Sequence, residues 1–319
     1  MDILERVRSA CKTVAAQATH VDINRDRVPA YAASLITHVT DKQTLDPSFH
    51  YAGHGEDSVA FIITLDAINF GSGYFPHLRK RPGMSGYFTI ASSLTDLFTK
   101  RGPLSARELS EITASDCAKI FAQDMDDPAV AELMSLFSRA LTDLGSYLRA
   151  RFHGRFSELI AAADHSAVRL VDILRVMPLF FDEEQYRGMN VPFYKRAQIT
   201  ASDLNLAFDG KEPGEFYDLD ELTIFADNMV PHVLRVDGIL SYNKDLVARI
   251  GEGELIPAGS EEEVEMRACA VHVVELIVEA ITAIGDQVTA QQLDNALWNR
   301  GQNPEYKAIP RHRTRTPYY

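Results

Sequence analysis

The sequence predicts a mainly α-helical protein that forms one large domain. Apolar residues recur at intervals of three and four along several long stretches, which is the spacing of a helix that buries one face. Strict alternation of apolar and polar residues is confined to two short stretches, 60–65 and 86–91, which are the candidate strands. No repeat, low-complexity tract or long linker divides the 319 residues. We therefore expect a single domain over residues 1–319, with two packed halves and a seam near residues 181–219.

The expected helices follow one another along the whole chain. The first covers residues 1–18 and the second residues 28–40. Ser105 with Glu108, and Ser260 with Glu263, have the spacing of a capping box, so each pair predicts the start of a helix. Periodicity predicts further amphipathic helices over residues 127–152, 166–181 with an end near Pro178, 195–208 and 222–234.

Asp227 lies in an unusual place within the last of these stretches, LTIFADNMVPHVL. It stands at the edge of the apolar stripe that predicts the helix. Pro231 follows four residues later and has no N–H to offer the carbonyl of Asp227, so we expect the helix to kink or end there. A carboxylate beside a broken backbone bond stabilises a helix poorly. It is better suited to directing an acid into a pocket.

The composition excludes several classes of function. A net charge of −13 argues against a long footprint on duplex nucleic acid, which requires many lysines and arginines. Three widely spaced cysteines form neither a disulfide framework nor a cysteine metal site. The N-terminus lacks the apolar core of a signal peptide, and no apolar run is long enough to span a membrane. We therefore expect a cytoplasmic protein that binds neither membrane nor stable duplex, and the sequence does not specify its oligomeric state.

Two polar motifs suit a pocket, and each has a plainer interpretation. His50 and His54 stand four residues apart, but neighbouring glycines disfavour a helix and no third metal ligand follows. A histidine lining a polar pocket, or one bonded to a loop backbone, is therefore favoured over a metal site. Asp66 and Asn69 lie three apart in an apolar run, so they either organise the core or face a ligand.

Two further motifs also have both a functional and a structural interpretation. Lys195 and Arg196 begin a predicted helix, where a basic pair suits a phosphate, although such a pair is more often a solvated surface. Trp298 follows Asp294 by one helical turn, and an aromatic ring beside a carboxylate suits a flat, polar heterocycle. Core packing with an exposed aspartate is the alternative. The chain contains no P-loop, HExxH or CxxC motif and no Ser-His-Asp order, so spacing alone predicts an α protein with a few pocket-like carboxylates.

Several stretches together resemble the queuosine salvage proteins, a family understood as queuosine 5′-phosphate N-glycosylase/hydrolase. The resemblance runs in order from about residue 45 to the C-terminus, and it rests on the stretches HYAGHGEDSVAFIITLDAINFGSGYFP, FYKRAQI, LTIFADNMVPHVLRVDGILSYNKDL, EVEMRACAVHVVELI and RTPYY. It implies a mostly helical fold similar to the helix-hairpin-helix DNA glycosylases. It also implies hydrolysis of queuosine 5′-monophosphate to queuine and ribose 5-phosphate.

The resemblance also implies roles for individual residues. The catalytic aspartate of the family falls on Asp227, and its base-contacting residues fall on His50, Phe225 and Asp294. Lys195 matches the lysine of the family's KRAQ motif and is expected to contact the substrate. No metal or cofactor is implied, and water is the only co-substrate. For the 5′-phosphate, we expect Lys195 to act, with Arg196 or Arg315 as its candidate partners.

Three alternatives stay open at this stage. The chain lacks the L-P-G-[VI]-G hairpin of the DNA-acting relatives, which weakens a base-excision glycosylase that would flip a base out of nucleic acid. A non-catalytic carrier of queuine, from a different class of function, would bind the base without turnover. A protein that assists tRNA handling is a weaker third possibility.

Overall fold

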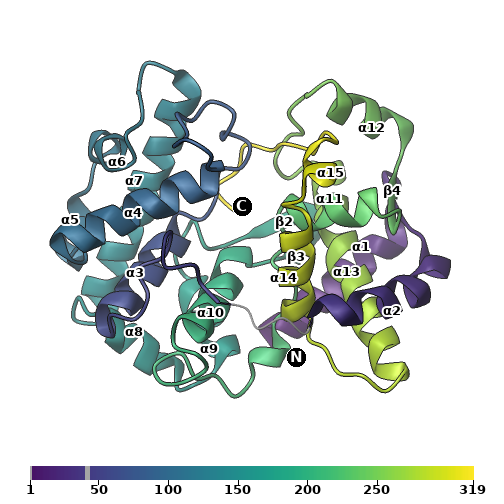
Figure 1. The fold of residues 1–319 in the computed structure, drawn as a ribbon, viewed down its shortest axis with the longest axis horizontal. Helices are drawn as coiled ribbons and strands as arrows, with labels where there is room; N and C mark the ends of the chain where they lie inside the picture. The colour runs from purple at the N-terminus through teal and green to yellow at the C-terminus, as the bar shows by residue number, and fades with distance from the viewer. Residues whose placement is uncertain (1, 40–43) are drawn as a thin grey trace.

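The computed structural model describes residues 2–39 and 44–319 and confirms a mainly α-helical single domain (Figure 1). The α-helices of these residues are α1 (Ile3–Gln17), α2 (Val28–Val39), α3 (Glu56–Ala67), α4 (Gly86–Arg101), α5 (Ala106–Glu111), α6 (Ala114–Ile120), α7 (Pro128–Arg151), α8 (Phe156–Ala163), α9 (Ala167–Leu174), α10 (Lys195–Ala207), α11 (Met229–Val236), α12 (Lys244–Gly251), α13 (Glu261–Ala283), α14 (Ala290–Arg300) and α15 (Pro304–Lys307). Two 3₁₀ helices are η1 (Arg25–Arg27) and η2 (Leu219–Glu221).

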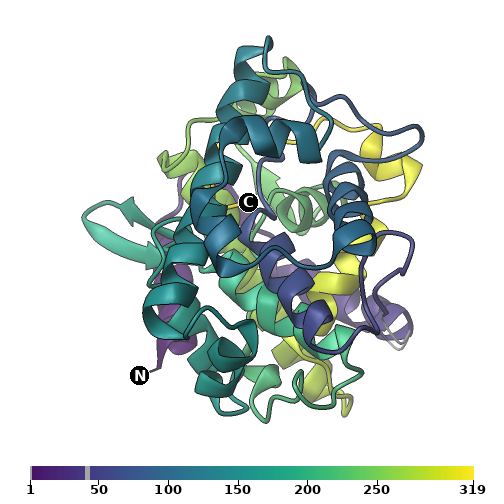
Figure 2. The same cartoon turned by 90° about the vertical axis from the view of Figure 1, so that its left-hand side faces the viewer.

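The strands of the described residues form two small antiparallel pairs. β1 (Val21–Ile23) pairs with β4 (Leu240–Tyr242), so the segment after α1 is joined to the segment after α11. β2 (Glu183–Tyr186) pairs with β3 (Met189–Pro192) in a hairpin that projects from the helical body (Figure 2). No helix of the described part of the chain is both long and apolar enough to cross a membrane.

The helices gather into two groups with the C-terminus between them (Figure 1). Helices α3 to α8 lie on one side, and α11 to α15 lie with α1 and α2 on the other. Helix α10 packs against α3 and α9, whereas α13 packs against α1, α2 and α11. The predicted seam near residues 181–219 stays a prediction.

Helix α13 is buried on nearly every side, and its buried charges are paired. The guanidinium of Arg267 donates to both carboxylate oxygens of Asp182, at 3.0 and 2.7 Å, and its Nε donates to the carbonyl of Ala226 at 2.9 Å. A buried ion pair is retained only when its remaining hydrogen-bonding groups are satisfied as well. Arg267 therefore fixes the backbone immediately before Asp227.

Several sequence predictions are confirmed and others are wrong. The capping box of Ser105 and Glu108 is present at α5. Ser260 caps α13, but the side chain of Glu263 accepts from the hydroxyl of Tyr319 instead of completing a box. The helix expected to end near Pro178 is α9, which ends earlier, at Leu174. The predicted second helix is α2, whereas its expected last residue, 40, lies outside the described residues.

Two predicted strands are wrong, and two strands lie where none was predicted. Residues 60–65 belong to α3 and residues 86–91 to α4. Both stretches are largely buried, and a short apolar run does not distinguish a buried helix from a strand. The β2–β3 hairpin lies between α9 and α10, where Arg187 and Gly188 form a two-residue turn with φ of 47° and 82°.

Candidate functional site

One cavity of about 1380 Å³ brings all five sequence-predicted site residues together. His50 precedes α3, Lys195 begins α10, Phe225 and Asp227 precede α11, and Asp294 lies in α14. The cavity is larger than the roughly 300–1,000 Å³ of common small-molecule sites. Segments that are far apart in the sequence therefore surround one cavity, which is large enough for a nucleotide-sized ligand.

Asp227 differs from its expected setting, because the helix begins after it. Helix α11 starts at Met229 and continues through Pro231, so the predicted kink or end at this proline is wrong. Proline is tolerated in the first turn, where its missing N–H would have no intrahelical partner. The Oδ1 atom of Asp227 accepts from the backbone N–H groups of Met229 and Val230, at 2.6 and 3.2 Å. The N-terminus of α11 therefore fixes the position of this carboxylate.

Residues 222–226 form no helix, and side chains satisfy several of their backbone groups. Gln198 accepts from the N–H of Thr223 at 2.8 Å, and Asp294 accepts from the N–H of Phe225 at the same distance. Arg267 donates to the carbonyl of Ala226. A helix would satisfy these groups internally, whereas here α10, α14 and α13 do so. The apolar periodicity of the segment reflects burial and not helical structure.

Lys195 is buried among carboxylates, so the surface interpretation of this residue is wrong. It is 5% exposed, and its Nζ donates to the carbonyl of Asn69 at 3.2 Å. Burial lowers the pKa of Lys195, and Asp227 and then Asp66 are the carboxylates that most oppose this shift. Lys195 thus supplies positive charge close to the candidate catalytic group.

The candidate partners of Lys195 at a phosphate lie elsewhere. The guanidinium of Arg196 is buried between the rings of Phe70 and Phe180, 4.8 and 4.6 Å from their centroids, and donates to the carbonyl of Ala67. Arg315 lies 3.9 Å from the carboxylate of Glu132. Neither arginine is among the residues that line the cavity.

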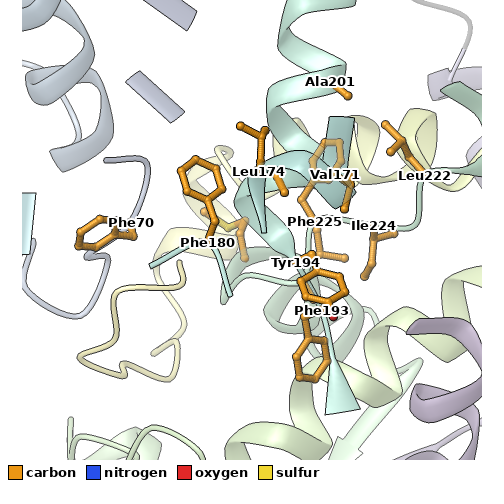
Figure 3. Packing of buried hydrophobic residues seen from close by; sticks show 14 of the residues in the cluster. Phe70, Val171, Leu174, Phe180, Phe193, Tyr194, Ala201, Leu222, Ile224 and Phe225 are labelled. Carbon is orange, nitrogen blue, oxygen red and sulfur yellow. The ribbon is translucent and has the colours of Figure 1, made fainter. Parts of the chain in front are cut away.

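Asp294 is 4% exposed, so the alternative of an exposed aspartate beside a packed tryptophan is wrong. Burial raises the pKa of Asp294 well above its usual range, and the charge of Asp227 raises it further. One turn later, the half-buried ring of Trp298 lies 6.3 Å from that of Tyr87, centroid to centroid. Phe225 lines the same cavity although it belongs to the hydrophobic core, as Figure 3 shows.

His50 lines the cavity with both ring nitrogens engaged. Its Nδ1 lies 3.0 Å from the carbonyl of Asp46, and its Nε2 lies 2.9 Å from the hydroxyl of Tyr87. Because a carbonyl only accepts, Nδ1 carries the hydrogen and Nε2 accepts from Tyr87. Burial lowers the pKa of His50, which favours this neutral form. A polar contact from this pair to a ligand is therefore available through the oxygen of Tyr87.

None of the described residues that line the cavity belongs to a group that could hold a metal ion. His54 is exposed and stacks on Tyr51, with ring centroids 3.8 Å apart. The described residues contain two groups whose ligand atoms approach closely enough to hold an ion, and neither lines the cavity; they are His20 with Glu261 and Glu265, and His165 with Glu212 and Glu215.

Three cavity residues were missed by the sequence reasoning: Tyr87, Asp203 and Arg311. Asp203 follows Lys195 by about two turns of the same helix, and this spacing is a signal that could have found it. Arg311 is half-buried, and its described contact is an Nη1 atom 3.2 Å from the sulfur of Met229. Its place beside Asp227 depends on how the C-terminal segment folds back, for which the sequence carries no local signal.

Comparison with known proteins identifies a family. A family model described as queuosine salvage protein matches residues 49–319. A relative from Sphaerobacter thermophilus, named queuosine 5′-phosphate N-glycosylase/hydrolase, is 42% identical over 98% of this chain and 97% of its own length. Relatives of the same name from Dictyostelium discoideum and Bos taurus are 30% and 29% identical, and each alignment covers 100% of both chains.

Proposed function

The chain belongs to the queuosine salvage protein family, and from this premise we propose that it hydrolyses the N-glycosidic bond of queuosine 5′-monophosphate. The products are queuine and ribose 5-phosphate. Water supplies a hydroxyl group to C1′, and a proton is delivered to the departing base. The observation that carries the proposal is family membership over nearly the whole chain, and the shared cavity of the five expected residues supports it.

Asp227 is proposed as the group that stabilises the transition state. Cleavage of an N-glycoside develops positive charge at C1′, which a nearby ionised carboxylate stabilises. One oxygen of Asp227 is held by the N-terminus of α11, and the other has no hydrogen-bond partner among the described residues. Lys195 and the N-terminus of α11 both bring positive charge close to this carboxylate. The free oxygen is available to the sugar or to the attacking water.

The base is proposed to leave with help from its pyrimidine edge. Queuine is a 7-deazaguanine, so the protonation of N7 that weakens other purine glycosides is not possible. Asp294 lines the cavity, and its raised pKa suits a carboxyl group that exchanges a proton or hydrogen bond with the base. Phe225 and Trp298 offer aromatic surface, and His50 acts through Tyr87.

Arg311 is proposed as the partner of the 5′-phosphate. It lines the cavity and has no carboxylate within ion-pair distance among the described residues. Burial lowers the pKa of Arg311, and the charge of Asp227 opposes this shift. A guanidinium without a carboxylate partner matches the geometry of a phosphate. Arg196 and Arg315, the partners expected from sequence, lie outside the cavity. The cytoplasm stays the predicted location, and the absence of stable duplex binding stays a prediction.

The test is direct. Purified protein is incubated with queuosine 5′-monophosphate, with and without a chelator, and free queuine and ribose 5-phosphate are separated by chromatography. We expect stoichiometric release of both products that the chelator does not change. Tight queuine binding without release would instead indicate a carrier, and release that required added divalent metal would contradict the metal-free reaction.

A further inference from the structure

We propose that Asp203 and the oxygen of Tyr87 form a subsite for an organic cation. The ligand group that it fits is the protonated secondary amine in the aminocyclopentenediol arm of the base. The inference rests on the proposed function, because the arm is part of that substrate. It adds a residue that selects the substrate by charge.

Asp203 is a buried carboxylate without a partner. It is 8% exposed and lines the cavity, and the described residues offer it no hydrogen bond or ion pair. By contrast, the buried carboxylate of Asp182 is paired with Arg267, and that of Glu265 accepts from the N–H groups of residues 19–21. An isolated buried charge is costly, so a ligand that completes the site accounts for its position.

The surroundings of Asp203 carry excess negative charge. Asp66 on α3 and Asp294 on α14 both repel the ionised carboxylate of Asp203, and Lys195 is the cation that acts on it. Burial first, and Asp66 second, raise the pKa of Asp203 well above its usual range. Tyr87 on α4 lines the same cavity, and burial first and the charge of Asp203 second raise the pKa of its hydroxyl. A bound cation would relieve this repulsion.

The arrangement favours an organic cation over a metal ion. No three of the described cavity residues bring carboxylate or imidazole ligand atoms within 4.8 Å of one another, which a shared ion would require. A secondary ammonium carries two N–H donors and needs separate acceptors. Asp203 is one acceptor, and the oxygen of Tyr87 is available as another because its hydrogen is donated to His50.

The subsite gives the enzyme a basis for rejecting nucleotides that lack the arm. A base without the amine leaves Asp203 buried and unpaired, and an unpaired polar group in a closed site discriminates strongly against the wrong ligand. Guanine and unsubstituted 7-deazaguanine are bases of this kind. The same cavity therefore accepts the pyrimidine edge of many purines but favours a base whose side arm is cationic.

Three bases separate the cation from the rest of the arm. Unsubstituted 7-deazaguanine has no amine, 7-aminomethyl-7-deazaguanine has the ammonium without the ring, and queuine has both. Their affinities are measured by competition calorimetry for the full-length wild type, Asp203→Asn and the matched control Asp286→Asn, in which an exposed aspartate outside the cavity changes in the same way. Thermal melts are recorded for every protein.

We expect the wild type and Asp286→Asn to bind the aminomethyl base about 10- to 100-fold more tightly than 7-deazaguanine, the range of a charge-assisted contact. Asp203→Asn should reduce this preference to within about threefold while the affinity for 7-deazaguanine changes little. The wild-type preference should also fall as the pH is lowered, because protonation of Asp203 removes its charge.

Two results would overturn the subsite. One is a wild type that binds the aminomethyl base no better than 7-deazaguanine, and this comparison does not depend on the folding of any variant. The other is a folded Asp203→Asn that keeps the full preference. In both cases hydrolysis of queuosine 5′-monophosphate by the wild type shows that the proposed function still holds, whereas failure to bind queuine and to hydrolyse the nucleotide would reject the function itself.

Discussion

The Oδ1 atom of Asp294 accepts a hydrogen bond from the backbone N–H of Phe225 at 2.8 Å, which joins α14 to the segment that leads into Asp227. The bond fixes the backbone of one candidate base-contacting residue, Phe225, through the side chain of another, Asp294. It also leaves Oδ2 of Asp294 without a hydrogen-bond partner among the described residues. Base recognition and the position of the catalytic carboxylate are therefore mechanically connected across two elements, 69 residues apart in sequence.

Asp227→Asn is expected to lower single-turnover hydrolysis of queuosine 5′-monophosphate by at least about two orders of magnitude, the loss typical of removing one electrostatic stabiliser. Asparagine caps helices about as well as aspartate, so the fold and queuine binding should survive. The readout is rapid-quench kinetics beside a thermal melt.

A matched control is available at the other end of the chain. Asp2 also accepts from two backbone N–H groups at a helix start, those of Leu4 and Glu5, but it is exposed and lies outside the cavity. Asp2→Asn should leave turnover unchanged. Near-normal hydrolysis by folded Asp227→Asn would mean that Asp227 is only a helix cap.

The sequence predicted the helical class and the identity of the site residues better than their local structure. Helices such as α1, α5 and α7 have amphipathic or capped sequences, so local patterns located them. Residues 222–226 have the same apolar spacing but form no helix, because Gln198, Asp294 and Arg267 satisfy backbone groups of this segment. Those partners are distant in the sequence, so the pattern of neighbouring residues does not reveal them.

The remaining site residues were missed for a related reason. Tyr87 lies in a stretch that alternates like a strand, and its role depends on a bond to His50, 37 residues earlier. Asp203 looks like an ordinary polar position of a helix, but the packing of the whole chain leaves it only 8% exposed at the cavity. In each case, burial and partners from other elements turn a common residue into a functional one.

Arg311→Gln is expected to abolish the preference for the 5′-monophosphate over the nucleoside queuosine. A contact between a guanidinium and a phosphate contributes about 1.5–3 kcal/mol, so kcat/KM for the nucleotide should fall about 10- to 100-fold. The value for the nucleoside should change little. Arg315→Gln is the control, since this arginine lies outside the cavity beside Glu132. Equal loss on both substrates, or a selective loss in Arg315→Gln, would contradict the assignment.

Lys195→Met is expected to reduce activity on the nucleotide and the nucleoside alike. The sequence suggested a phosphate ligand, but the ammonium is buried close to Asp227 and Asp66 and bonded to the carbonyl of Asn69. Its removal would leave buried carboxylates without their cation and raise their pKa. Steady-state kinetics on both substrates should show parallel losses in kcat/KM. A loss confined to the nucleotide would restore Lys195 as a phosphate ligand.

The last prediction concerns stability in acid. His232 is buried in α11, its Nε2 donates to the carbonyl of Tyr306 at 2.9 Å, and burial lowers its pKa to about 4. In the unfolded chain the pKa returns to about 6.5, so between these values the unfolded state binds more protons than the native state. The native state is therefore destabilised as the pH falls through this window, by about 2 kcal/mol between pH 7 and pH 5 from this residue alone.

His232→Gln isolates that contribution. An amide nitrogen takes the place of Nε2 and can still donate to Tyr306, but it does not titrate. We expect the variant to lose less stability than the wild type between pH 7 and pH 5, with the two free energies of unfolding from urea titrations converging by about 2 kcal/mol. Buried carboxylates with raised pKa values, such as Asp294, stabilise the native state as the pH falls and so oppose the effect of His232. Both proteins contain these carboxylates, so their contribution cancels when the two free energies of unfolding are subtracted. Parallel pH profiles would show that His232 is protonated in the native state and that its bond to Tyr306 tolerates the charge.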